Sequence, residues 1–421
     1  MQVYYLPNTP KIKTILLIGM KKFISLLSAL FCATGFIFAQ NVESLPLDPS
    51  FKVGKLDNGM TYYIRHNALP ENRAEFYLAT NVGAIQETPD QDGLAHFLEH
   101  MCFNGTKNFP EKSLLNWLES IGASFGGNVN ASTGIEQTQY MLNNIPLTRP
   151  SIVDSCLLIM HDYSHFVTLD PKEIDAERGV ILEEKRTRNT SGWRTFIQSK
   201  NYLYKGSKFA DESLIGSEDN LKNFKPSSLE NFYHTWYRPD MQALIVIGDI
   251  DVNEIEAKIK TIFADIPAAE NPKAKDDCSI PDNKEPIVGI ITDKELSNTS
   301  VEIYWKSKAN PRELNETNVK FMTNLIEDII GNVMNERFQD IASKSDAPFL
   351  GAGLGMGRLC EGTDGTFANA SCKDGESITA LKACLTEVLK MQKFGFSADE
   401  VERAKNEILA GFESAAKKAD T

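Results

Sequence analysis

A stretch rich in proline and charge divides this 421-residue sequence into two parts. Residues 267–286 include Pro281 and Pro286 and contain few apolar side chains that a core could bury. Such a composition is typical of a linker between domains. We therefore predict a first domain over residues 40–266 and a second domain over residues 287–421.

Patterns typical of strands and of helices occur in both parts. Alternating or continuous apolar runs predict strands over residues 61–66, 75–82, 124–132, 137–143, 244–250, 287–293 and 299–305. Helical periodicity predicts helices over residues 94–104, 113–121, 149–164, 171–187, 252–263, 315–344, 376–393 and 398–418. Strands and helices mixed in blocks indicate the α+β class, with helices packed on sheets in both domains.

The charge balance disfavours one class of function. The hydrophobic fraction of 42% is normal for a globular chain, and the net charge is -13 with no dense basic patch to offset it. Nucleic acid is therefore not expected as a partner.

Residues 1–39 are predicted to be a leader that ends in a signal peptide. From Met20 the sequence has a basic start, an apolar centre and small residues up to Ala39, after which we expect cleavage. The alternative is a membrane anchor, but the apolar run is short for a span and polar sequence follows it. No membrane span is expected after cleavage. The mature chain is thus predicted to be exported, to the periplasm in the first instance, with the cell surface or secretion as alternatives.

Residues 93–105 read GLAHFLEHMCFNG and place two histidines four residues apart. On a helix, positions i and i+4 share a face, so His96 and His100 point the same way and could both reach one divalent ion. Glu99 borders that face, where a carboxylate can act as a general base. The alternative is an ordinary amphipathic helix with a satisfied histidine pair, and the HxxEH pattern alone does not decide between the two.

A third ligand is available in residues 170–185, which read DPKEIDAERGVILEEK. Glu177 and Glu184 are seven residues apart, so two helical turns place them on one face. Glu184 could complete a three-ligand site with one position open for water and substrate, and Glu177 could orient a histidine from behind. Glu183 is a less favoured competitor for the ligand role. The alternative is a solvated acidic helix face, the usual environment of glutamates.

These motifs resemble the pitrilysin/insulinase family of zinc peptidases, which includes the mitochondrial processing peptidase. The resemblance covers most of the chain and is most specific at HFLEHM, FNGTKNFP and ERGVILEE. It implies one zinc ion bound by His96, His100 and Glu184. It also gives Glu99 the role of the base and Glu177 that of a supporting carboxylate. The spacing between the two signatures is longer than the family pattern leads us to expect, and we place the extra residues in loops.

The resemblance further implies a substrate-binding strand and a partner. Asn130 and Ala131 match the family's Asn-Ala-x-Thr strand, where substrate backbone would bind as an added strand. The family forms a clamshell in which each half contains two related domains of antiparallel-rich sheet with packed helices. The chain would supply one half, with a non-catalytic and incomplete second domain. The other half would come from a longer chain or a partner subunit.

Other motifs have simpler explanations. His161 and His165 also lie four residues apart, but the helix carries a core stripe and no carboxylate partner is evident, so we predict packing rather than a second metal site. Residues 351–357, GAGLGMG, lack the strand-loop-helix setting of a phosphate loop and are better explained as a packed strand. Cys360 and Cys372 could form a disulfide, although buried free thiols are equally compatible with the sequence.

The sequence therefore predicts an exported zinc metalloendopeptidase that hydrolyses peptides or unfolded proteins. A zinc-activated water would attack the peptide bond, with Glu99 as general base. The alternative is a non-catalytic or partner-dependent subunit of a two-half peptidase chamber. Inactive relatives lose motif residues, whereas here His96, Glu99, His100 and Glu184 are all present, which favours activity.

Overall fold

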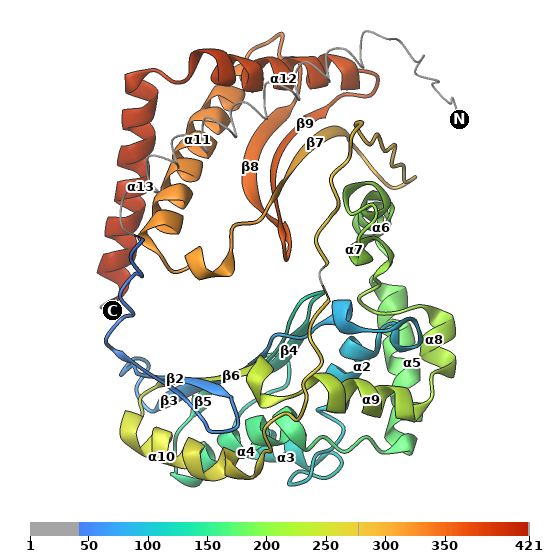
Figure 1. Cartoon of the computed structure of the whole chain (residues 1–421), viewed down its shortest axis with the longest axis vertical. Helices are drawn as coiled ribbons and strands as arrows, with labels where there is room; N and C mark the ends of the chain where they lie inside the picture. Colours follow the sequence, from blue (N-terminus) through green and yellow to red (C-terminus); the bar gives the residue numbers. More distant parts are fainter. Residues whose placement is uncertain (1–41, 277, 420–421) are drawn as a thin grey trace. The chain divides into compact units, whose positions relative to one another are not determined.

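The computed structural model describes residues 42–276 and 278–419, so the predicted leader lies outside the described part of the chain. The chain divides into two compact units (Figure 1). One unit is Leu47–Cys278, and the other combines Ser279–Thr421 with the residues before Leu47. Within the described ranges, no helix is both long enough and apolar enough to cross a membrane.

The first unit is built on a six-stranded sheet. Its strands are β1 (Phe51–Lys55), β2 (Thr61–His66), β3 (Arg73–Thr80), β4 (Val129–Thr133), β5 (Thr138–Pro146) and β6 (Gln242–Gly248). They are ordered β1-β2-β6-β3-β5-β4, with β2 and β6 parallel and every other neighbouring pair antiparallel. This order places β4 at an edge of the sheet, with one side unpaired.

Some of the helices of this unit contact the sheet and others pack on those helices. They are α2 (Leu94–Met101), α3 (Ser113–Ser120), α4 (Ser151–His165), α5 (Pro171–Thr187), α6 (Ser191–Leu203), α7 (Lys208–Asp211), α8 (Glu218–Asn223), α9 (Pro226–Trp236) and α10 (Val252–Ile262), with the short 3-10 helices η1 (Ala84–Gln86), η2 (Pro89–Gln91), η3 (Pro239–Met241) and η4 (Phe263–Asp265). Alternation along β3 turns Ala74, Phe76 and Leu78 into the core. Helix α4 contacts β3 and β5, α10 contacts β2, and α2 contacts the edge strand β4 (Figure 1).

The second unit contains a three-stranded antiparallel sheet in the order β7-β9-β8. Its elements are β7 (Thr299–Lys308), η5 (Arg312–Leu314), α11 (Asn318–Ala342), β8 (Gly351–Cys360), β9 (Thr363–Cys372), α12 (Ser377–Phe394) and α13 (Ala398–Ala419). Buried Phe338, Leu354 and Cys384 join α11, β8 and α12 in one core. Nε of Arg337 lies 2.6 Å from Oε1 of Glu400, and this ion pair fastens α13 to α11.

The predicted strand over residues 287–293 was wrong. This segment forms no strand, and Val288 and Ile290 are 72% and 69% exposed. Its β-branched residues favour an extended backbone, but a strand also needs a neighbouring strand to complete its hydrogen bonds. None of the named strands in the described ranges pairs with this segment.

The glycine-rich residues 351–357 form most of β8, as predicted, and pair with β9. At Gly355 an added Cβ would collide with the ring of Phe367, so glycine here permits close packing within the sheet. Cys360 ends β8 and Cys372 ends β9. Both are buried, and no disulfide joins them.

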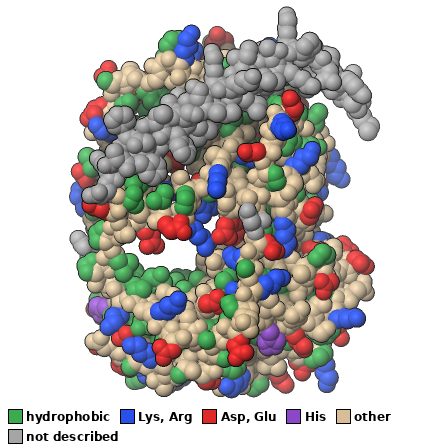
Figure 2. All heavy atoms as spheres, in the orientation of Figure 1, with side chains coloured by type: hydrophobic (Ala, Val, Ile, Leu, Met, Phe, Trp, Pro, Cys, Tyr) green, Lys and Arg blue, Asp and Glu red, His purple; other side chains and the backbone are tan. Residues whose placement is uncertain are grey.

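The surface carries charges of both signs. On the face shown in Figure 2, acidic and basic side chains of the described residues are interspersed. The net charge of -13 is therefore not gathered into one field on this face. In view there is no broad basic area that would attract a polyanion.

Candidate metal centre

Helix α2 carries the HxxEH motif and has a well-defined start. It begins after Gly93, whose φ of 90° favours glycine and whose Cβ, if added, would collide with the backbone of Ile215 and Gly216. The buried carboxylate of Glu87 accepts hydrogen bonds from the N–H groups of Gly93 (2.7 Å) and Ala95 (2.6 Å). These two bonds satisfy backbone donors that the first turn leaves without a partner, so Glu87 fixes where α2 starts.

Three predicted ligands meet between α2 and α5. Oε1 of Glu184 lies 3.5 Å from Nε2 of His96, and Oε2 lies 3.2 Å from Nε2 of His100. The two imidazole ring centroids are 4.8 Å apart. One ligand atom from each of these three residues lies within 4.8 Å of the other two. The structure therefore brings His96, His100 and Glu184 together, although they come from distant parts of the sequence.

Helix α5 is anchored so that Glu177 and Glu184 face α2. Asp170 caps the start of the helix by accepting a backbone hydrogen bond, and Ile174 and Ile181 are buried along its length. Glu177 and Glu184 each follow one of these isoleucines by three residues, so they border the buried stripe. The apolar anchors of α5 thus set the position of both carboxylates.

Glu177 supports His100 from the side away from Glu184. Its Oε1 lies 2.8 Å from Nδ1 of His100, and its Oε2 accepts a hydrogen bond from Nδ2 of Asn104 at 2.7 Å. A carboxylate on Nδ1 holds a proton there, so Nε2, on the side facing Glu184, is the nitrogen that can give up its proton and offer a lone pair to a metal. The contact of Asn104 with Glu177 was not predicted, although the position of Asn104 four residues after His100 could have indicated that contact.

The competing glutamate, Glu183, points elsewhere. Its side chain is 59% exposed and pairs with Arg186, whose Nε lies 2.9 Å from Oε2 of Glu183. Glu184 is less exposed, and besides the histidines it contacts Arg188, whose guanidinium nitrogen lies 2.6 Å from Oε1. The structure thus places Glu184, and not Glu183, beside the two imidazoles.

The charges in this cluster favour a cation. Burial lowers the pKa of His100, but the neighbouring carboxylates of Glu177 and Glu184 outweigh burial and raise it to about 9. Hydrogen bonds from His100 and His96 hold the pKa of Glu184 well below its usual range. Burial raises the pKa of Glu177, yet its hydrogen bonds to His100 and Asn104 lower it overall. The surroundings therefore stabilise positive charge between two ionised carboxylates.

The donor atoms fit a zinc ion. Two imidazole nitrogens and one carboxylate are a ligand set found in catalytic zinc sites, where a fourth position stays open. Neighbouring ligand atoms of a tetrahedral zinc ion are ~3.3 Å apart. The two contacts of Glu184 with Nε2 of His96 and of His100, 3.5 Å and 3.2 Å, agree with this spacing. Little movement of the side chains would be needed to bind the metal.

Glu99 lies next to these ligands on α2 and is only 8% exposed. The hydroxyl of Thr133, the last residue of β4, donates a hydrogen bond to Oε2 of Glu99. Thr133 matches the threonine of the Asn-Ala-x-Thr pattern, but no role was predicted for it. The signal was present, because Thr133 follows Ala131 by two residues and alternation places the two side chains on one face of the strand.

Asn130 and Ala131 lie on the edge strand, as the resemblance implied. The carbonyl of Asn128 accepts a hydrogen bond from the N–H of Asn143 on the β5 side (2.6 Å). Because alternate residues of a strand direct their N–H and C=O groups to opposite sides, Asn130 also pairs toward β5 and Ala131 faces the unpaired side. The N–H of Ala131 donates to Oδ1 of Asn130 (2.9 Å), and the Asn130 side chain is exposed.

A second group of carboxylates lies at the start of α2. It consists of Glu87, Asp92 and Glu212. Both oxygens of Glu87 already accept backbone hydrogen bonds, and Asp92 accepts one from the N–H of Ser217 at 2.7 Å. Burial raises the pKa of Glu212 to about 7, so this carboxyl holds a proton more readily than an exposed one. These groups fasten the loop between α7 and α8 to the start of α2 rather than offering free donors to a metal.

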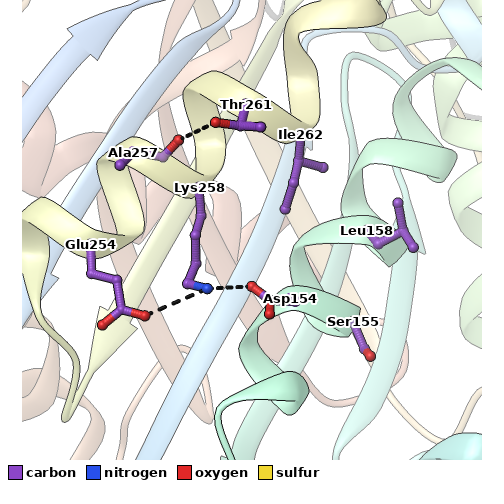
Figure 3. Close-up of a pocket in the computed structure, with 8 residues that line it drawn as sticks. All are labelled: Asp154, Ser155, Leu158, Glu254, Ala257, Lys258, Thr261 and Ile262. Carbon is purple, nitrogen blue, oxygen red and sulfur yellow. Dashed lines mark hydrogen bonds and ion pairs between the residues drawn. The ribbon is translucent and has the colours of Figure 1, made fainter.

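A groove between α4 and α10 lies away from these residues. It is lined by Asp154, Ser155, Leu158, Glu254, Ala257, Lys258, Thr261 and Ile262 (Figure 3). Nζ of Lys258 lies 2.6 Å from Oδ1 of Asp154 and 3.5 Å from Oε1 of Glu254. Lys258 pairs with both carboxylates of the groove, and the lining contains none of the predicted site residues.

Two family models match the sequence. Residues 63–200 match Insulinase (Peptidase family M16), and residues 223–408 match the Peptidase M16 inactive domain. The first match contains the HxxEH helix and the helix that carries Glu184. The chain belongs to the insulinase family of peptidases, family M16.

The most informative relatives are named as zinc proteases. The probable zinc protease PqqL of Escherichia coli (strain K12) is 30% identical over 375 residues, which cover 88% of this chain and 40% of that protein. The probable zinc protease PqqL of Haemophilus influenzae is 32% identical over 326 residues, covering 76% and 34%. The chain thus spans less than half the length of these curated relatives.

Two solved structures of PqqL also match most of this chain. The crystal structure of the first half of the periplasmic protease PqqL from Escherichia coli matches with a TM-score of 0.77 and 28% identity, covering 90% of this chain and 80% of that one. The structure of PqqL itself matches with the same TM-score and 29% identity, but only 41% of it is covered. The chain therefore has the α+β fold of one half of a two-half peptidase.

Proposed function

We propose that this chain is the metal-binding part of an exported zinc metalloendopeptidase that hydrolyses peptide bonds in peptides or unfolded proteins. The observation that carries the proposal is the convergence of His96, His100 and Glu184, with Glu99 beside them. The relatives named as zinc proteases support the same chemistry. Because the chain spans only 40% of the Escherichia coli relative, the activity of a whole protein is part of the proposal.

In this proposal His96, His100 and Glu184 hold one zinc ion. When bound, zinc supplies a Lewis acid that activates water and polarises the carbonyl of the scissile bond. Glu177 keeps the proton of His100 on Nδ1, so that Nε2 stays available as a ligand. Three protein ligands leave room for water and substrate at the open position.

Glu99 is the proposed general base and later the general acid. Its carboxylate accepts a proton from the attacking water and returns it to the nitrogen of the leaving amine, as the C–N bond breaks. The low exposure of Glu99 keeps competing water away from the carboxylate, and its place on the same helix as two ligands fixes its distance from them. The same side chain therefore serves both proton transfers without a change of position.

Strand β4 is the proposed binding strand for substrate. A peptide would add to the unpaired edge as a further strand and bond to the N–H and C=O of Ala131. The side chain of Asn130 now occupies the N–H of Ala131, and a substrate carbonyl would take its place. Recognition through backbone groups is independent of side chains, which suits unfolded segments of varied sequence.

A second peptidase half is the proposed partner. The chain matches the first half of PqqL and 41% of the whole protein. We place it as one half of a clamshell that is closed by the rest of a longer chain or by a partner subunit. A partner-dependent subunit without activity of its own is the alternative. The periplasm is the proposed compartment, from the predicted leader and the periplasmic relative.

The test compares the wild type with Glu99→Gln and Glu183→Gln. Glu183 is an exposed neighbour of the ligand Glu184, so its substitution controls for the loss of one negative charge. Bound zinc is measured by atomic absorption and hydrolysis with a quenched fluorescent peptide. We expect all three proteins to retain one zinc ion, and Glu99→Gln to lose at least about a hundredfold in kcat.

Two results would contradict the proposal. If Glu99→Gln cleaves the peptide as fast as the wild type, Glu99 is not the general base. A wild type that stays inactive, even after addition of the proposed second half, would contradict the proposed peptidase activity. If activity appears only on that addition, the partner-dependent form of the proposal is supported.

A further inference from the structure

The carboxylate of Glu99 is held by a single side chain. The hydroxyl of Thr133 donates to Oε2 of Glu99, and among the described residues this is the one hydrogen bond that the Glu99 carboxylate receives. Glu99 is 8% exposed, so solvent makes only a small contribution to its orientation. Oε1 has no protein donor in the described ranges and is free to accept a proton.

The direction of the Thr133 side chain follows from the alternation of β4. Val129 is buried in the core, Ala131 packs against it, and Thr133 continues the same face toward α2. Asn130 and Ser132, between them, are exposed. A hydroxyl at any even position of this strand would therefore point away from Glu99.

Both partners of this hydrogen bond are fixed by other contacts. Thr133 pairs with Thr138 at the end of the β4-β5 ladder. The turn that follows is tied to η1, because the carbonyls of Gly134 and Ile135 accept hydrogen bonds from Ala84 (3.2 Å) and Ile85 (2.8 Å). On the other side, Glu87 caps α2 and so fixes the helix that carries Glu99. The hydrogen bond thus joins two anchored elements.

We propose that Thr133 is a positioning residue for the proton transfers of Glu99, and that it sets this carboxylate relative to the substrate-binding edge. The inference rests on the function proposed above and goes beyond it. The hydroxyl holds Oε2 and so limits rotation of the carboxylate, which keeps Oε1 directed to the reacting atoms. Because the backbone of β4 would also bind the substrate, one strand aligns both the peptide bond and the base.

A purely structural role for Thr133 makes a different prediction. Loss of a structural contact lowers stability and affects zinc content or KM along with kcat. Loss of a positioning contact lowers kcat while KM and zinc content change little, because the interaction matters in the transition state. Thr133 touches none of the three proposed ligands in the described contacts, so zinc binding is an independent readout.

The experiment uses Thr133→Val, Thr133→Ser and Ser132→Ala in the same chain, together with the second half if activity requires it. Valine keeps the β-branched shape that suits a strand but has no hydroxyl, whereas serine keeps the hydroxyl. Ser132→Ala removes an exposed hydroxyl from the adjacent residue and serves as the control. Each protein is measured for kcat, KM, bound zinc and thermal unfolding, with Thr133→Ala as a second variant if Thr133→Val does not fold.

We expect Thr133→Val to lose about tenfold in kcat with KM within about twofold of the wild type, as for loss of one hydrogen bond to a charged group. Thr133→Ser is expected to retain most of the wild-type kcat, and Ser132→Ala all of it. An unchanged kcat in Thr133→Val or in its alanine substitute overturns this inference and leaves the proposed function intact. A wild type that never cleaves peptide overturns both.

Discussion

Helices α2 and α4 each carry two histidines four residues apart, but the two pairs have different partners. On α2, Nε2 of His96 and Nε2 of His100 both face Glu184. On α4, His161 is enclosed by carboxylates, with Nδ1 3.0 Å from Asp162 and Nε2 2.7 Å from Asp265. Both nitrogens of that ring are occupied, so none is left to converge with a second histidine.

The difference shows that spacing alone does not make a metal site. Asp162 is fully buried and also accepts hydrogen bonds from the Thr106 hydroxyl (2.7 Å) and the N–H of Asn108 (2.8 Å). His161 and Asp162 thus hold the loop that follows the HxxEH helix. The pair on α4 serves structure, while the pair on α2 has a third donor, Glu184, opposite its free nitrogens.

The largest expected effect separates the two pairs by zinc content. His100→Ala should lose stoichiometric zinc, because one of three proposed protein ligands is removed. His165→Ala, the corresponding change on α4, should keep it. Zinc per chain is measured by atomic absorption after dialysis. A His165→Ala protein without zinc would show that the α4 pair also binds metal and would break the comparison.

The reverse contrast should appear in stability. His161→Ala is expected to lower the free energy of unfolding by about 2 kcal/mol, because it removes a hydrogen-bond partner of the buried Asp162 carboxylate. His165→Ala should lower the free energy of unfolding by less, since the ring of His165 is only partly buried. Denaturant unfolding of the zinc-free proteins measures both. Equal stability of His161→Ala and the wild type would contradict a structural role for His161.

The carboxylates behind the two rings offer a third contrast. Glu177→Gln should weaken zinc binding by about ten- to a hundredfold, as for loss of a carboxylate that orients a ligating histidine. Asp265→Asn removes the carboxylate on Nε2 of His161 and should leave zinc affinity unchanged. Competition with a chromophoric chelator gives both dissociation constants. Identical zinc dissociation constants for the two variants would show that Glu177 does not support zinc binding.

The smallest effect is a difference in titration. In the zinc-free protein the pKa of His100 is raised to about 9, whereas burial and the nearby His234 lower the pKa of His165. Protonated His100 therefore stabilises the fold fully below pH ~6.5, and this contribution is lost as the pH rises through about 9. Histidine NMR signals measure the two pKa values. Denaturant unfolding across this range should show the loss in wild type and not in His100→Ala.

Much of the candidate metal centre could be predicted because its proposed ligands lie on helices, where spacing fixes direction. Helix α5 spans Pro171–Thr187, the same residues that periodicity predicts. Strand β4 is shorter than predicted and begins at Val129 rather than at residue 124. Gly126 has a φ of 80°, so the backbone turns there before the strand can start. The ends of an element, which depend on turns, are thus harder to predict than the face on which its side chains lie, which depends on the helical or strand period.

Apart from the cluster of His96, His100 and Glu184 that the family resemblance implied, contacts between distant segments were not predicted. Strand β9 was missed because its buried positions are small or polar, such as Thr363, Ala368 and Ala370, and give a weak alternating pattern. The cap that Glu87 places on α2 depends on where a preceding loop returns, which no local pattern encodes. For Thr133 and Asn104 the local pattern gave the face of each side chain, but not its partner on another element, Glu99 or Glu177.

The position of β6 has a consequence for the order of events during synthesis. This strand lies between β2 and β3, although it is the last strand of the first unit to be made. All residues proposed for the metal centre precede Gln242 in the chain. The nascent chain therefore carries every ligand before the strand that joins β2 to β3 exists. The sheet that carries β4 is completed only when residues 242–248 join β2 to β3, so we expect the proposed ligands to reach their final positions late in the folding of this unit.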